Sequence, residues 1–211
     1  MQHSSFRRVR ALGLATALVG WSFVGPRLPA RVPLQAGLAG LLVLVTRAPL
    51  GLRPPPLWTG LRLGLAAGSA AATAVAISTS IPVVRVSMAE RELPAPTSAW
   101  LALRIPLGTV WAEEAAFRAA LAAVAGRGYG ASGGRLLQGI AFGLSHIADA
   151  RATGEPVLPT VLATAGAGWL FGWLAEHSGS LSAPMLAHLA INESGAAAAL
   201  MIQRRSRASL R

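Results

Sequence analysis

The feature that most constrains the fold is an uncharged apolar stretch at residues 63–84. A helix needs roughly 20 predominantly apolar residues to cross the hydrocarbon core of a bilayer, and this stretch is long enough. Of the 211 residues, 53% are hydrophobic and only 13% are charged, whereas a soluble domain carries about 25% charged residues. We therefore predict an all-α fold, a polytopic transmembrane bundle of about six to eight helices.

Other apolar stretches extend this prediction along the chain. Further helices are predicted at residues 11–26, 32–46, 98–125, 136–148, 161–175 and 181–202, with connections at residues 87–96, 126–134, 149–159 and 178–180. The first of these helices follows a basic segment, as the core of a signal peptide would. Residues 28–30 make a poor cleavage site, so we interpret the segment as a first transmembrane helix.

The chain is strongly basic, with a formal net charge of +11, and it contains arginine but no lysine. In a soluble protein this charge would suggest binding to nucleic acid. Here the arginines flank apolar segments, so the expected partner is the lipid bilayer with its anionic headgroups, and no nucleic acid is expected. Cysteine is absent from the sequence, which excludes disulfides and thiolate chemistry.

Both ends of the chain are basic, which would place both in the cytoplasm under the positive-inside rule. That arrangement needs an even number of spans, whereas the apolar stretches number about seven. Either one segment is miscounted, re-entrant or split, or the C-terminal arginines do not set the orientation. The sequence leaves these alternatives open.

The polar residues that could carry chemistry are concentrated in the second half of the chain. We divide the sequence into N-terminal transmembrane helices (1–97), a helical core with the candidate chemistry (98–202) and a basic C-terminal tail (203–211). An ionisable group at the centre of a membrane helix costs about 2.5–3.5 kcal/mol on insertion scales. Such groups persist where they pair, face a cavity or take part in a reaction.

The first candidate cluster consists of Glu113, Glu114 and Arg118. Glu114 and Arg118 are four residues apart, so a helix places them on one face, where they can form an ion pair. Glu113 is turned about 100 degrees away from Glu114 and lacks that partner. A carboxylate in apolar surroundings is a stronger base than in water, which suits a general base. The alternative is a helix end near the headgroups, where all three charges are solvated.

Two further pairs have the same four-residue spacing, Phe142 with His146 and His188 with Asn192. His146 could share a proton with Glu113 or bind a metal through its neutral imidazole. His188 and Asn192 could donate two hydrogen bonds to an oxyanion or supply metal ligands. For both pairs the alternative is simple hydrogen bonding between helices.

The clusters are more informative together than singly. Each lies on a different predicted helix, so packing can bring Glu113, His146, His188 and Asn192 to one cavity as a hydrolytic site. The sequence contains no His-Glu-x-x-His zinc motif. Its only aspartate is Asp149, which excludes a protease with paired aspartates. A protease with this sequence would therefore attack the peptide bond with an activated water molecule and not with a covalent nucleophile.

The three clusters, in this order and spacing, resemble the CAAX protease and bacteriocin-processing (CPBP or Abi) family of intramembrane proteases. This family includes the type II CAAX prenyl endopeptidases. Its pattern is Glu-Glu-x-x-x-Arg, Phe-x-x-x-His and His-x-x-x-Asn, which this sequence matches at residues 113–118, 142–146 and 188–192. The stretch GWLAEHSGSLSAPMLAHLAIN is also typical of the approach to the third motif, and the resemblance covers residues 99–197.

The resemblance implies an intramembrane endopeptidase in which Glu113 activates the hydrolytic water with help from His146. His188 and Asn192 would stabilise the oxyanion of the tetrahedral intermediate. The residues that would support and orient the site are Glu114, Arg118 and Phe142. The family is often described as metalloproteases, so zinc held by Glu113, His146 and His188 is the alternative to a metal-free glutamate mechanism.

Arginine without lysine, together with abundant Ala and Gly, indicates a bacterial plasma membrane as the location. The expected substrate is then a membrane-associated peptide or protein, as in bacteriocin maturation or immunity, rather than a farnesylated protein. Two other functions remain open. One is a non-enzymatic membrane scaffold or immunity protein that uses the same cavity. The other is a small proton-coupled transporter, although the sequence shows no internal inverted repeat.

Overall fold

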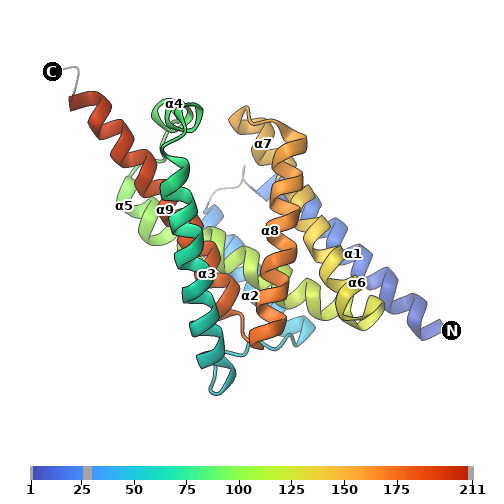
Figure 1. Cartoon of the computed structure of the whole chain (residues 1–211). Helices are drawn as coiled ribbons and strands as arrows, with labels where there is room; N and C mark the ends of the chain where they lie inside the picture. The colour runs from blue at the N-terminus through green and yellow to red at the C-terminus, as the bar shows by residue number, and fades with distance from the viewer. Residues whose placement is uncertain (1, 26–29, 209–211) are drawn as a thin grey trace.

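The computed structural model describes residues 2–25 and 30–208, and these residues form helices and no strand (Figure 1). In chain order the α-helices are α1 (Gln2–Val24), α2 (Arg31–Thr46), α3 (Pro56–Ser78), α4 (Pro82–Glu90), α5 (Thr97–Ala99), α6 (Ala122–Ser145), α7 (Ile147–Thr153), α8 (Val157–Ser178) and α9 (Ser182–Ala208). Between α5 and α6 lie two wider π-helical segments, η2 (Trp100–Trp111) and η3 (Glu114–Leu121). The predicted all-α fold class is confirmed.

Three helices of the described residues are long and apolar enough to cross a membrane, namely α3, α8 and α9. Helix α2 is apolar but shorter. Helices α3 and α9 pack against each other along their length, and α8 packs against both (Figure 1). The chain is therefore a membrane protein whose three candidate spans pack against one another.

Close packing of α3 on α9 depends on small residues. Three buried glycines with four-residue spacing face α9 from α3: Gly60, Gly64 and Gly68. A Cβ atom on Gly64 would lie 2.9 Å from the backbone of Ala183, so the helices approach more closely than a side chain would allow. Because Gly60 faces Ser182 and Gly68 faces Ala190, the two helices run parallel. Small residues at this spacing are typical of helix pairs in a bilayer, where the hydrophobic effect does not drive association.

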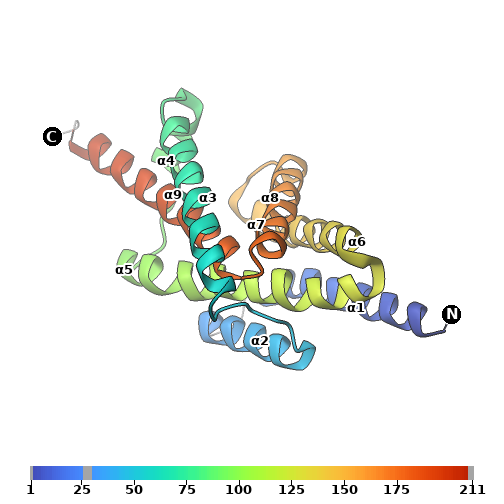
Figure 2. The ribbon, with the colours of Figure 1, turned by 60° about the horizontal axis from the view of Figure 1, so that its bottom comes forward.

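Helix α6 folds back against η3 at a single glycine. The turn predicted at residues 126–134 is confined to Gly130, whose φ of 74° and ψ of 175° break an otherwise helical segment. Gly134 then lies against the start of the same helix, where a Cβ atom on it would be 2.7 Å from Gly126 N. In Figure 2 the chain reverses direction here, and α6 returns between α1 and α8, against which it packs.

The predicted span at residues 63–84 is wrong at its C-terminal end. Helix α3 ends at Ser78, and a separate helix, α4, begins at Pro82. A proline inside a helix has no N–H, and its ring clashes with the carbonyl four residues earlier, which here is that of Ser78. Helix α4 continues to Glu90, so the connection predicted at residues 87–96 starts later than expected.

The connection predicted at residues 149–159 is wrong as well, because α7 fills its first half and α8 begins at Val157. Asp149 lies in the first turn of α7 and Arg151 in its last turn, where each charge complements the helix dipole. The last helix also runs beyond the predicted residue 202, to Ala208. Residue 26 of the first predicted helix, most of the weak cleavage site and residues 209–211 lie outside the described residues.

Replacing Gly64 with leucine should lower the free energy of unfolding by about 1–3 kcal/mol, because the new side chain overlaps rigid backbone. The measurement is the thermal unfolding midpoint of the purified protein in detergent. Gly166→Leu on α8 is the matched control, since Gly166 faces open space. Equal midpoints for the two variants would contradict close packing of α3 on α9.

Candidate active site

The ion pair predicted between Glu114 and Arg118 is present in η3 and is fully buried. Arg118 Nε lies 3.3 Å from Glu114 Oε2, and both side chains have 0% exposure. The geometry does not make a hydrogen bond, and all three guanidinium nitrogens lack a hydrogen-bond partner among the described residues. Charge attraction in surroundings of low dielectric constant therefore holds this pair together.

Aromatic rings cover the rest of the Arg118 guanidinium. Its Cζ atom lies 3.8 Å from the ring centroid of Phe142, 5.1 Å from that of Phe171 and 6.0 Å from that of Phe117. A guanidinium over a ring face is attracted by the ring quadrupole. Phe142 comes from α6 and Phe171 from α8, so Arg118 lies where both helices meet η3. Sequence reasoning missed Phe171 because α8 is apolar all round and shows no preferred face.

His188 connects α9 to this ion pair. Its Nδ1 atom lies 2.7 Å from Glu114 Oε1, and the histidine side chain is only 8% exposed. The carboxylate accepts a hydrogen bond, so Nδ1 carries the proton and donates it. The imidazole also contacts the rings of Phe171 and Phe142, with centroid distances of 5.3 and 6.3 Å. His188 is therefore fixed in both orientation and tautomer.

Glu113 lies at the partly exposed edge of this cluster, although its Oε2 atom is buried and makes no hydrogen bond among the described residues. Its Oε2 atom is 3.9 Å from His188 Nε2, and its side chain is 29% exposed, in contrast to the neighbouring Glu114 at 0%. A separation of 3.9 Å is too long for a direct hydrogen bond, but it allows an ion pair when the imidazole is protonated. Glu113 has no ion pair with an arginine among the described residues, as the helical spacing predicted; its pairing with His188 was not predicted.

His146 directly follows α6, and its ring contacts Phe142, which in turn contacts Arg118 and His188. The rings of His146 and Phe142 contact each other at 4.6 Å between centroids. His146 Nδ1 lies 2.8 Å from the Phe142 carbonyl oxygen, so Nδ1 is the donor, and in the neutral imidazole Nε2 is then an acceptor. Within the described residues, Glu113 pairs with His188 rather than with His146, the partner proposed from the sequence.

Asn192 lies one helical turn beyond His188 on α9. Its Nδ2 atom donates a hydrogen bond to the His188 carbonyl oxygen at 3.1 Å. An amide nitrogen carries two hydrogens, so one N–H is left for another acceptor. Asn192 is only partly buried, which keeps that group accessible.

The zinc alternative does not fit this arrangement. Among residues 2–25 and 30–208, no group of three His, Cys, Asp or Glu side chains could hold a metal ion. Glu113 and His188 are close to each other, but no third His, Cys, Asp or Glu side chain of the described residues lies near enough to complete a metal site with them.

A buried ion-paired cluster with a carboxylate and an imidazole at its edge, set among apolar helices, defines a helical membrane protein with a polar candidate site. Residues 95–193 match the family model "Type II CAAX prenyl endopeptidase Rce1-like". No curated protein and no solved structure matches the chain. The resemblance to CAAX proteases is thereby confirmed, and residues 95–193 form an Rce1-like region that contains every candidate site residue.

Replacing Arg118 with methionine should lower the free energy of unfolding by about 3–5 kcal/mol, because the Glu114 carboxylate then stays buried without its cation. The double variant Glu114→Gln/Arg118→Met should recover much of this loss, since it removes both charges. Denaturant unfolding in mixed micelles measures both effects.

The matched control is Arg135→Met. Arg135 pairs with Glu176 at 2.6 Å, but these side chains are 17% and 39% exposed. A partly exposed pair contributes about 1 kcal/mol or less, and the Arg135 guanidinium also lies 4.8 Å from the Trp169 ring centroid, so this variant should lose only about 1–2 kcal/mol. A loss for Arg118→Met no larger than that for Arg135→Met would contradict a structural role of the buried pair.

Proposed function

We propose that the chain is an intramembrane endopeptidase that hydrolyses a peptide bond of a membrane-associated peptide or protein. The observation that carries this proposal is the meeting of Glu113 and His188 at the accessible edge of a buried charged cluster. The Rce1-like match supports a CAAX-protease-type function in general. We further propose a multi-pass arrangement in a bacterial plasma membrane, in keeping with the three candidate spans.

Charge balance supports proton transfer at this edge. Glu114 and Arg118 neutralise each other, which leaves the negative charge of Glu113 beside His188. One additional proton, held by either His188 or Glu113, makes the whole cluster neutral. A buried cluster is least costly when its charges cancel, so this proton has two favourable positions. Such a pair can take a proton from one group and return it to another.

In the proposed reaction, Glu113 accepts a proton from a water molecule while the water oxygen bonds to the carbonyl carbon of the scissile peptide. The carbonyl oxygen becomes an oxyanion. Collapse of the tetrahedral intermediate breaks the C–N bond, and the proton held by Glu113 passes to the leaving amine. His146, with Nε2 unprotonated, would help to orient the reacting water.

His188 and Asn192 are the proposed oxyanion donors. His188 donates from Nε2 when it is doubly protonated, and the Glu114 carboxylate at Nδ1 stabilises that imidazolium, as the carboxylate does in a catalytic triad. Asn192 contributes the amide N–H that is not used on the His188 carbonyl. Arg118 and Phe142 act as positioning residues, since they hold Glu114 and both histidines.

Glu113→Gln should slow cleavage at least about 100-fold, because it removes the base while keeping the shape of the side chain. The assay uses the full-length protein in liposomes. The probes are a peptide ending in a prenylated Cys-a-a-X sequence and a pool of membrane peptides, with products identified by mass spectrometry. The unfolding midpoint of the variant should match wild type.

Glu193→Gln is the matched control, since this carboxylate follows Asn192 on another face of α9 and makes no ion pair among the described residues. It should keep wild-type activity. Full activity of Glu113→Gln would overturn the mechanism. Absence of cleavage in wild type, with a cellular phenotype that survives Glu113→Gln, would instead indicate a scaffold or immunity protein.

A further inference from the structure

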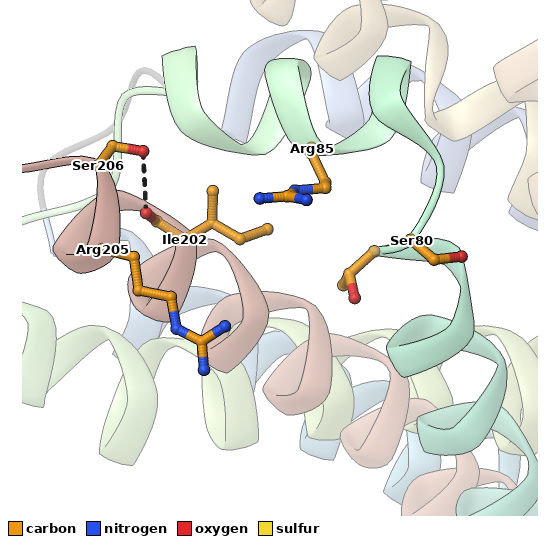
Figure 3. A pocket seen from close by; sticks show the side chains of 6 residues that line it. Ser80, Arg85, Ile202, Arg205 and Ser206 are labelled. Atoms are coloured by element: carbon orange, nitrogen blue, oxygen red, sulfur yellow. Dashed lines mark hydrogen bonds between the residues drawn. The ribbon is translucent and has the colours of Figure 1, made fainter. Parts of the chain in front are cut away.

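A pocket of about 510 Å³ lies away from the candidate active site, where the C-terminal ends of α3 and α9 meet α4. The residues that line it are Thr79, Ser80, Arg85, Ile202, Arg205 and Ser206. Figure 3 shows Arg85 reaching in from α4 and Arg205 extending from α9, with Ile202 between them. The pocket therefore presents two guanidinium groups on either side of an apolar side chain.

Neither arginine has a carboxylate partner among the described residues, whose ion pairs all involve other side chains. The end of α3 does not need them either. Thr79 Oγ1 donates to the Ala76 carbonyl at 2.6 Å and Ser80 Oγ to the Ile77 carbonyl at 2.7 Å. The same two carbonyls also accept the backbone N–H groups of Thr79 and Ser80, so the end of α3 is satisfied by its own residues. The pocket thus carries positive charge without an internal counter-charge.

The two arginines are held apart by a fixed part of the fold. Gln203 on α9 donates from Nε2 to the Met88 carbonyl at 3.1 Å and to the Arg91 carbonyl at 2.8 Å. These bonds attach the C-terminal end of α4 to α9. The separation of Arg85 and Arg205 therefore depends on helix packing and not on a free loop.

The pocket lies where a membrane surface is expected. Helices α3 and α9 are candidate spans that run parallel, so both of their C-terminal ends reach the same side. Next to Arg85, α4 exposes Val83 at 72% and Val86 at 54%, as a helix lying in the membrane interface does. Further arginines gather at this end: Arg91, Arg204 and Arg207. Because the positive-inside rule favours an arginine-rich end, we place this side at the cytoplasmic leaflet.

We propose that this pocket binds the phosphate group of an anionic phospholipid of the cytoplasmic leaflet. Arg85 and Arg205 donate to the phosphate oxygens, a geometry that the planar guanidinium favours. The exposed valines of α4 contact the acyl chains below the headgroup. This proposal is independent of the proteolytic function, because none of the pocket residues belongs to the candidate active site.

The test is a titration of the full-length, delipidated protein with phosphatidylglycerol in neutral detergent, followed by native mass spectrometry. Arg85→Gln/Arg205→Gln should weaken binding about thirtyfold, since each arginine near an anionic lipid surface contributes roughly fivefold. Arg85→Lys/Arg205→Lys should lose less, because it keeps the charge. The matched control, Arg53→Gln/Arg62→Gln, removes two exposed arginines near the N-terminal end of α3 and should bind as wild type does.

Equal binding of phosphatidylglycerol by wild type and Arg85→Gln/Arg205→Gln would overturn the proposal. Equal affinity of wild type for phosphatidylcholine, which has no net charge, would do the same. Full competition by millimolar inorganic phosphate would identify a site for the free ion and would also reject the lipid. If the double variant does not fold, Arg205→Gln alone, at an exposed position, should still show a loss of about fivefold.

Discussion

The Glu114 carboxylate is the group on which the candidate site depends, because its two oxygens hold two groups, Arg118 on η3 itself and His188 on α9. Oε2 is paired with Arg118 and Oε1 accepts from His188. Burial of one unpaired charge costs several kcal/mol, so each of the three groups is stable only in the presence of the others. Through Phe142 and Phe171, the Arg118 guanidinium extends this dependence to α6 and α8. One carboxylate thus determines where three helices meet η3.

Glu113, directly before η3, and Glu114, its first residue, differ sharply in exposure, and the proposed mechanism gives them different tasks. Glu114 is fully enclosed, with both oxygens in ion-pair contact, so it can stabilise a charge but cannot meet a substrate. Glu113 is 29% exposed and faces the one histidine nitrogen that Glu114 does not occupy. The proposed general base, Glu113, has to reach the substrate. Glu114 orients His188 and therefore has to stay fixed. In the proposed mechanism, two adjacent residues with different exposure meet these two needs.

The sequence predicts those parts of the fold and site that depend on local spacing. The four-residue spacing predicts the Glu114–Arg118 pair, and apolar length predicts helices at α3, α8 and α9. The partner of Glu113 could not be predicted in this way. That partner depends on how α9 packs against the segment around Glu113, a contact between residues 75 positions apart that local spacing does not encode. Uniformly apolar α8 likewise gives no sign that Phe171 faces Arg118.

Helix α9 carries both the candidate chemistry and the arginine-rich surface, and its length separates them. His188 and Arg205 are 17 residues apart on this helix, which at 1.5 Å per residue is about 25 Å. The hydrocarbon core is about 30 Å thick, so with Arg205 at one headgroup layer and α9 upright, the imidazole lies in the opposite leaflet, about 5 Å from the edge of the core. A lipid phosphate held by Arg205 is then too far away to act on charges at Glu113, because screening and distance weaken the interaction. Any influence of that lipid on the site has to be mechanical, through the tilt or depth of α9.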